Sequence, residues 1–172
     1  MKGLPRVRLL IFVGLTVLLG AGLTPRSAAA EHYAPLTLTC GSAKVTMSCK
    51  KGSSCTQTVM RMTTVDGKSV MLAKPKGLED RTAVGMACAE ASDKSNYVVV
   101  EFGDLPSGCE FCEWFALYDM KGGKLTDNDP AILVDKTMDD AHQQYPNNNQ
   151  FDELAKKWKL NHPRRAYINV AH

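Results

Sequence analysis

Two cysteines three positions apart form the motif of this chain whose residue types and spacing could carry out a reaction. Cys109-Glu110-Phe111-Cys112 can close a disulfide within one turn of chain, and such a pair is redox-active when a helix N-terminus lowers the pKa of the first thiol. The residues that follow, 114–118, alternate like a strand, and acidic neighbours such as Glu110 disfavour a thiolate. We therefore expect a structural disulfide, with a thiol-disulfide redox factor as the alternative.

All six cysteines follow a leader-like segment, and an even number of cysteines in an exported chain indicates disulfides. Cys49 and Cys55 flank a polar turn between two strand-like segments, so their sulfurs would face each other across a hairpin. The short motif can close on itself, which leaves the two remaining cysteines for each other. The expected pairs are Cys49 with Cys55, Cys109 with Cys112, and Cys40 with Cys88.

Other patterns that could bind a metal or catalyse a reaction are weak. A zinc site would need a second ligand pair, and His142 has no histidine three to five residues away. Asp127-Asn128-Asp129 lacks the glycine and the glutamate of a helical calcium loop and is expected to be a turn. Asp139-Asp140 is expected on a solvated face. Because metalloprotease and serine-hydrolase motifs are missing as well, we expect no cofactor, no metal and no enzymatic activity.

The first 30 residues resemble an export signal. They contain a basic start, an apolar run over residues 9–19 and the small-residue site Ala28-Ala29-Ala30, which predicts cleavage after Ala30. An N-terminal membrane anchor is the alternative, but the run is about half of the roughly 20 residues that a span needs. We therefore expect residues 31–172 to form one domain in the periplasm, without stable membrane insertion.

Charge and length narrow the class of partner. The chain of 172 residues has 21 basic and 18 acidic side chains, a formal charge of +3. Four of the basic residues lie in the leader, which contains no acid, so 17 basic residues face 18 acidic ones in the rest of the chain. Nucleic acid is therefore not an expected partner, because a folded part with a net charge of −1 has no basic excess for phosphates.

Alternating apolar and hydroxyl side chains predict strands in the first half of the mature chain. Leu36–Cys40 and Val45–Cys49 show the pattern, Asp66-Gly67 is a strong hairpin signal, and Tyr97–Phe102 is the clearest central strand. Residues 78–91 are ambiguous between a short helix and a strand. The expected arrangement is an antiparallel meander with one face against the core. Further candidate strands are residues 56–65, 70–72, 113–119, 131–134 and 166–170.

A helix is expected near the C-terminus. Asn149 stands at a capping position, and apolar residues then follow at helical spacing up to Trp158, before residues 161–163 end the helix at a proline. Residues 135–145 are polar and 146–149 are expected to be a loop. The fold class is therefore α+β: mainly antiparallel β, as a meander or a small sandwich or barrel, with one C-terminal amphipathic helix and disulfide stabilisation.

Without a catalytic motif, the sequence favours a binding module that occludes another protein. In the loop 103–112, two glycines and a proline restrict the path, and a disulfide would present Glu110 and Phe111 as a plug for an enzyme cleft, with Asp104 beside them. Trp114, Tyr118 and Trp158 are expected in the core; an exposed one would be an anchor for a protein partner.

In overall plan the chain resembles periplasmic inhibitors and immunity proteins of bacteria, which neutralise cell-wall or lipid hydrolases. Leu38-Thr39-Cys40-Gly41 with Val45-Thr46 is similar to the first hairpin of periplasmic lysozyme inhibitors over about ten residues, and the rest of the chain departs from that family. The resemblance implies a protein partner such as a secreted hydrolase or a type VI effector. A structural envelope protein is a further alternative.

Overall fold

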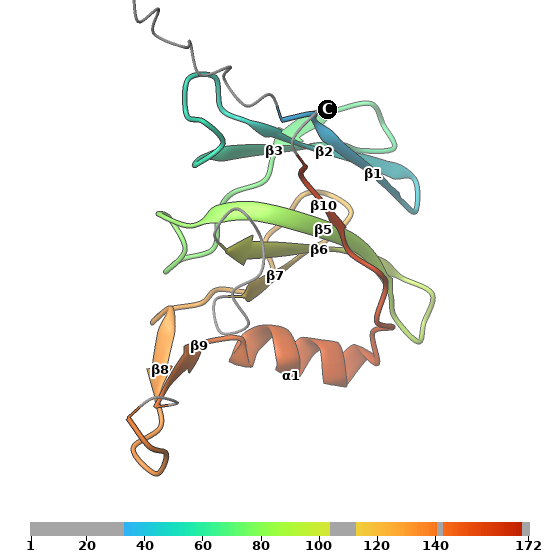
Figure 1. Cartoon of the computed structure of the whole chain (residues 1–172). Helices are drawn as coiled ribbons and strands as arrows, with labels where there is room; N and C mark the ends of the chain where they lie inside the picture. Colours follow the sequence, from blue (N-terminus) through green and yellow to red (C-terminus); the bar gives the residue numbers. More distant parts are fainter. Residues whose placement is uncertain (1–32, 104–112, 141–142, 170–172) are drawn as a thin grey trace, which may run out of the picture.

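The computed structural model describes residues 33–103, 113–140 and 143–169, and Figure 1 shows their arrangement. The leader, the loop residues Asp104, Glu110 and Phe111, and the Cys109/Cys112 pair lie outside the described residues. In chain order the elements are β1 (Leu36–Cys40), β2 (Ala43–Cys49), β3 (Thr58–Thr63), β4 (Ser69–Met71), β5 (Thr82–Glu90), β6 (Asn96–Gly103), β7 (Trp114–Tyr118), β8 (Ile132–Val134), β9 (Gln144–Pro146), α1 (Asn149–Trp158) and β10 (Ala166–Tyr167).

The strands form two four-stranded antiparallel sheets and one two-stranded hairpin. The outer sheet has the order β1-β2-β3-β4, and the central sheet has the order β10-β5-β6-β7. Figure 1 shows three layers, with the outer sheet above the central sheet and α1 below it. The prediction of mostly antiparallel sheet with one short C-terminal helix is confirmed.

Alternate side chains of the outer sheet fill the space between the two sheets. In β2 and β3 burial follows the two-residue period of a strand with one covered face. Val45, Met47 and Met60 are buried in the cluster shared with the central sheet, whereas Lys44 and Arg61 are exposed on the opposite face. The charged residues of these two strands therefore face water, whereas Thr58 of β3 is buried.

The central sheet is buried on both faces. Phe102, Trp114 and Tyr118 belong to the cluster between the sheets, while Val99 and Leu117 belong to a second cluster under α1. The expectation of one core-facing side is wrong for this sheet, because the helix covers the other side. The ambiguous segment 78–91 contains β5, whose residues are almost continuously buried, as in a strand packed on both faces.

The helix α1 begins and ends differently from the prediction. Asn148, rather than Asn149, is the N-cap, and its side chain makes no capping bond. The helix ends at Trp158, because Lys159 takes a left-handed backbone conformation (φ 51°). This end lies before residues 161–163, where the sequence predicted it. The Trp158 ring stacks on Tyr97, with 4.7 Å between the ring centroids, and so attaches α1 to the central sheet.

The segment 131–147 contains a hairpin that the sequence pattern does not reveal. Residues 135–146 were expected to be polar chain and loop, but β9 pairs with β8, with Leu133 opposite Tyr145. The Asp135 amide continues the ladder by donating to the Gln143 carbonyl at 2.7 Å. The expected strand 131–134 is present as β8, but β9 has only three residues, too few for alternation to be recognised.

Two of the predicted disulfides are present. Cys40–Cys88 joins β1 to β5 and therefore connects the two sheets, and Cys49–Cys55 closes the turn after β2. Among the residues that the structure describes, no helix is long and apolar enough to cross a membrane.

Replacing the Cys40–Cys88 pair by serines should destabilise the protein more than replacing Cys49–Cys55. The bridges span 48 and 6 positions, for which chain entropy gives about 4 and about 2 kcal/mol. Urea unfolding of the two double variants measures the difference. Equal losses would contradict the ranking.

Trp158→Ala should weaken the attachment of α1. Because the side chain is partly buried and stacked on Tyr97, a loss of about 2 kcal/mol in the free energy of unfolding is expected, below the range for a fully buried aromatic. Lys157→Ala, at the exposed neighbouring position, serves as the control and should change stability by less than about 0.5 kcal/mol.

Candidate functional site

The hairpin 131–147, here called the arm, is the first surface that suits an interaction. Figure 1 shows β8 and β9 projecting from the layered body beside the start of α1. Val134, Met138 and Tyr145 on the arm are 53%, 48% and 40% exposed, and they are three of the five large apolar side chains that are exposed in the described part of the chain. Apolar side chains gathered on a projection mark an interaction surface more often than scattered ones do.

The base of the arm is fixed to the body by hydrogen bonds. The Ala131 carbonyl accepts from the Trp114 indole Nε1 at 2.7 Å and from the Asn147 amide at 2.8 Å. The Asn147 side chain donates to the Pro130 carbonyl at 2.8 Å. The Asn147 bonds close the base of the arm on itself, and the bond from Trp114 on β7, with one from the Asn128 side chain to the Asn147 carbonyl at 2.6 Å, joins that base to the body. Because an isolated two-stranded hairpin is marginal in water, these two contacts to the body help to hold the arm in place.

Carboxylates accompany the apolar side chains of the arm. Asp135 accepts hydrogen bonds from the Thr137 hydroxyl at 2.6 Å and from the Thr137 amide at 2.9 Å, and these bonds lower the pKa of the Asp135 carboxyl. Asp139 and Asp140 are exposed farther along, with Lys136 between them and Asp135. The described part of the arm therefore combines apolar contact area with a net negative charge.

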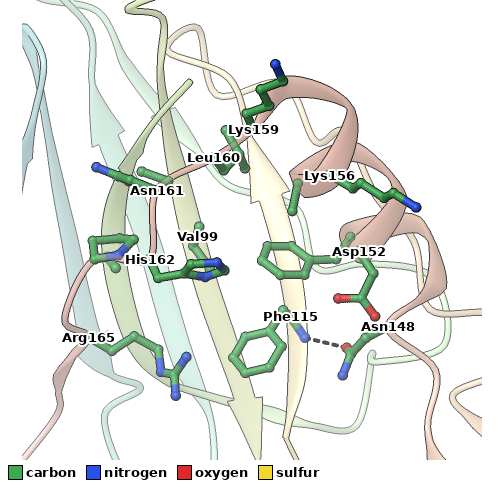
Figure 2. A pocket seen from close by; sticks show the side chains of 15 residues that line it. Val99, Phe115, Asn148, Asp152, Lys156, Lys159, Leu160, Asn161, His162 and Arg165 are labelled. Atoms are coloured by element: carbon green, nitrogen blue, oxygen red, sulfur yellow. Dashed lines mark hydrogen bonds between the residues drawn. The ribbon is translucent and has the colours of Figure 1, made fainter. Parts of the chain in front are cut away.

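A groove of about 570 Å³ between α1 and the central sheet is the second candidate. Its floor is apolar, and Figure 2 shows the side chains that surround it. Ala87 and Ala89 on β5 and Val99 on β6 line its floor and are buried in the cluster under the helix. Polar residues at the sides of the groove are Asn148, Asp152, Lys156, Lys159, Asn161, His162 and Arg165.

Arg165 is held over the floor of this groove by a buried acid. Glu101 is 2% exposed and lies on β6. Its Oε2 is 2.6 Å from Arg165 Nε and accepts a hydrogen bond from the Tyr167 hydroxyl at 3.0 Å. The guanidinium carbon lies 4.9 Å from the centre of the Phe115 ring. A buried carboxylate is costly unless it is paired and hydrogen-bonded, and here both conditions are met.

Glycine at position 85 allows this network to form. A Cβ on Gly85 would lie 2.8 Å from Tyr167 Cδ1, which is closer than real contacts allow. The Tyr167 ring therefore lies directly on β5, opposite Gly85 in the β10–β5 ladder, and its hydroxyl reaches Glu101. Any larger residue at this position would displace the ring.

Asn148 links the start of α1 to the edge of the central sheet. Its Oδ1 accepts from the Phe115 amide at 2.8 Å, and its Nδ2 donates to the Glu113 carbonyl at 3.0 Å. The side chain thus makes the two backbone hydrogen bonds that a neighbouring strand would make along this edge of the sheet. Asp152, one turn into the helix, faces the groove in Figure 2, and burial raises the pKa of its carboxyl.

The other residues that the sequence singled out lie in the core or make local structural contacts. Trp114 and Tyr118 are buried, as expected for core residues. Asp127 is tied to the Lys124 ammonium and accepts from the Lys76 amide; it lies in an irregular segment rather than in the expected turn. His162 is exposed beside the groove. Among the described residues no group of three His, Cys, Asp or Glu side chains could hold a metal ion.

Sequence reasoning missed both the arm and the Glu101 network. A charged residue after three valines in β6 is a signal that could have indicated a buried acid, but its partners lie 64 and 66 positions away. No protein-family model, curated protein or solved structure matches this chain.

The free energy of unfolding should depend on pH through the titration of Glu101. Burial raises the pKa of this carboxyl, against the lowering effects of Tyr167 and Arg165. A raised folded-state pKa gives stability that is present below the unfolded value, about 4.3, and is lost as the pH rises through the folded value. The wild type should therefore lose stability relative to Glu101→Gln as the pH rises from about 4.

Urea midpoints of both proteins across this pH range measure the effect. Tyr167→Phe removes a hydrogen bond that lowers the pKa, so its loss of stability should extend to higher pH. A wild type that gains stability relative to Glu101→Gln as the pH rises from about 4 would contradict the prediction.

Proposed function

We propose that this protein is a non-enzymatic, exported binding protein that occupies and neutralises another protein. The class of partner is a secreted toxin or hydrolase that attacks the cell envelope, such as a type VI effector, and the protein would act as its immunity or inhibitor protein in the periplasm. The observation that carries the proposal is the arm, a braced projection with exposed apolar side chains beside carboxylates.

The arm suits insertion into a cleft of the partner. Its apolar side chains Val134, Met138 and Tyr145 supply area that loses water on binding, and tyrosine is common among residues that dominate interface energies. Asp135, Asp139 and Asp140 would meet basic groups at the rim of the cleft. Such charge pairs speed association and select the partner more than they add affinity.

The attachment of the arm lowers the cost of binding. A projection whose base is already held by Trp114 and Asn128 loses less conformational freedom on association than a flexible loop does. The two disulfides stabilise the body that carries the arm, and they agree with an oxidising compartment. The proposal also includes the cleaved leader and the amphipathic character of α1. The loop residues Asp104, Glu110 and Phe111 remain candidate contacts beside the arm.

The test is neutralisation of a defined partner. Because immunity proteins are encoded beside their targets, the product of each adjacent gene is expressed in a bacterial periplasm with and without this protein. Growth rescue and a saturable complex of the two purified proteins are the expected results. If no adjacent product is toxic or forms a complex, the immunity proposal fails.

Val134→Asp and Tyr145→Ala should each weaken the complex by about thirty-fold, which corresponds to the loss of a hot-spot side chain of about 2 kcal/mol. Val65→Asp is the matched control, because Val65 is 78% exposed at the turn after β3, away from the arm. Isothermal titration with the partner measures the three affinities. Equal affinities of wild type and both arm variants would overturn the role of the arm.

A further inference from the structure

We infer that the outer sheet docks, through its open face, on the anionic headgroups of a phospholipid membrane. The inference does not rest on the proposed function or on the arm. It rests on the cations of this face, on the separation of charge within the molecule, and on two exposed apolar side chains beside the cations.

The open face of the outer sheet, here called the basic face, carries hydroxyl groups and cations. The strand registers place four of these side chains opposite one another in a row across the sheet: Thr39, Lys44, Thr63 and Ser69. Arg61 lies in the next row, opposite Thr46. Lys50 extends the side of Lys44, because its amide donates to the Gln57 carbonyl at 2.8 Å and so continues the β2–β3 ladder.

The cations of the basic face are not neutralised by nearby acids. Residues 36–71 contain five basic side chains and one acidic side chain. That acid, Asp66, is paired with Lys68 at 2.8 Å. The other four basic residues form no ion pair in the described part of the chain: Lys44, Lys50, Lys51 and Arg61. Arg61 donates to the Ser69 hydroxyl at 3.2 Å, which holds the guanidinium across the sheet.

The rest of the molecule has the opposite charge. Residues 82–169 contain nine basic and fourteen acidic side chains. Figure 1 shows the outer sheet at the opposite end of the molecule from α1 and the arm. A planar anionic surface can therefore meet the basic face while the acidic part is directed away from it. A long soluble polyanion that wraps around the protein would be repelled by the acidic part.

Two exposed apolar side chains favour a lipid surface over other anions. Val65, at the turn after β3, and Met71, on β4, are the exposed large apolar side chains of the described residues that do not belong to the arm. Met71 Sδ lies 3.5 Å from Arg61 Nη2. Apolar side chains beside cations can enter the boundary between headgroups and acyl chains. A phosphate polymer in water offers no such apolar layer.

Vesicle sedimentation tests the inference on the disulfide-bonded protein purified from a bacterial periplasm. The probes are vesicles of equal parts phosphatidylcholine and phosphatidylglycerol, and vesicles of phosphatidylcholine alone. The protein should bind the anionic vesicles and not the neutral ones, and about 1 M NaCl should release it, because the screening length is then about 3 Å. No binding to the anionic vesicles, equal binding to both, or binding that survives this salt would overturn the inference.

Two pairs of substitutions locate the contact. A cation near an anionic surface strengthens binding about five-fold, so Lys44→Gln with Arg61→Gln should weaken it about twenty-five-fold. Lys136→Gln with Lys157→Gln removes the same charge from the arm and α1, and this control should change binding by less than about two-fold. Equal weakening in both would assign the effect to net charge and overturn the inference.

Lys50→Gln with Lys51→Gln decides the matter if the first pair does not fold. Both residues are exposed in the turn that Cys49–Cys55 closes, outside the strands, and the same loss of about twenty-five-fold is expected. Unchanged binding would overturn the role of the basic face.

Val65→Ser separates a membrane from a soluble phosphate polymer, because it keeps the charge and removes an apolar side chain. It should weaken binding to the anionic vesicles by about three-fold or more. Unchanged binding would overturn the choice of a lipid. Inorganic polyphosphate is the competing probe, and tighter binding of polyphosphate than of the vesicles, at equal phosphate concentration, would assign the basic face to a soluble polymer and overturn the membrane inference.

Discussion

The burial of both faces of the central sheet is the constraint on which the rest of the structure depends. The outer sheet needs a partner for its methionine-rich inner side, and α1 needs a partner for Phe151 and Trp158. Both use the same strands, β5, β6 and β7. These strands therefore consist of almost continuously buried residues, and the hydrophobic effect acts on them from two sides.

The charged residue Glu101 interrupts this apolar surface, and the pairing that neutralises it fixes the position of β10. Glu101 lies on the α1 side of β6, where an unpaired carboxylate would lose its hydration without compensation. Arg165 and Tyr167 compensate it, so the segment that follows α1 must return across the sheet to form β10. The same contact that satisfies the acid places a guanidinium over the Phe115 ring, and a local energetic requirement thereby shapes the groove.

Side-chain amides connect the edge of the central sheet to the arm and to the helix. Asn148 pairs with the backbone of β7 and begins α1, and Asn147 closes the base of the arm. Asn128, which is buried, donates to the Asn147 carbonyl at 2.6 Å. An exposed strand edge is a risk for aggregation, and these amides cover it while fixing the two neighbouring elements. A convex arm and a concave groove therefore arise on opposite sides of one short loop.

The sequence by itself determined the local features, because alternation, turn signals and cysteine spacing act over a few residues. It predicted strands near 36–49, 97–102 and 114–118, the helix that includes Trp158, and the pairs Cys40–Cys88 and Cys49–Cys55.

The tertiary structure alone decided which faces are covered and which distant residues meet. Nothing near Glu101 in the chain indicates Arg165, and the three residues of β9 carry too little pattern to predict that they pair with the expected strand 131–134. A local pattern records whether a side chain avoids water, but the element that covers it is chosen by packing among segments far apart in the chain. Both candidate sites arise from such packing, and they were therefore invisible in the sequence.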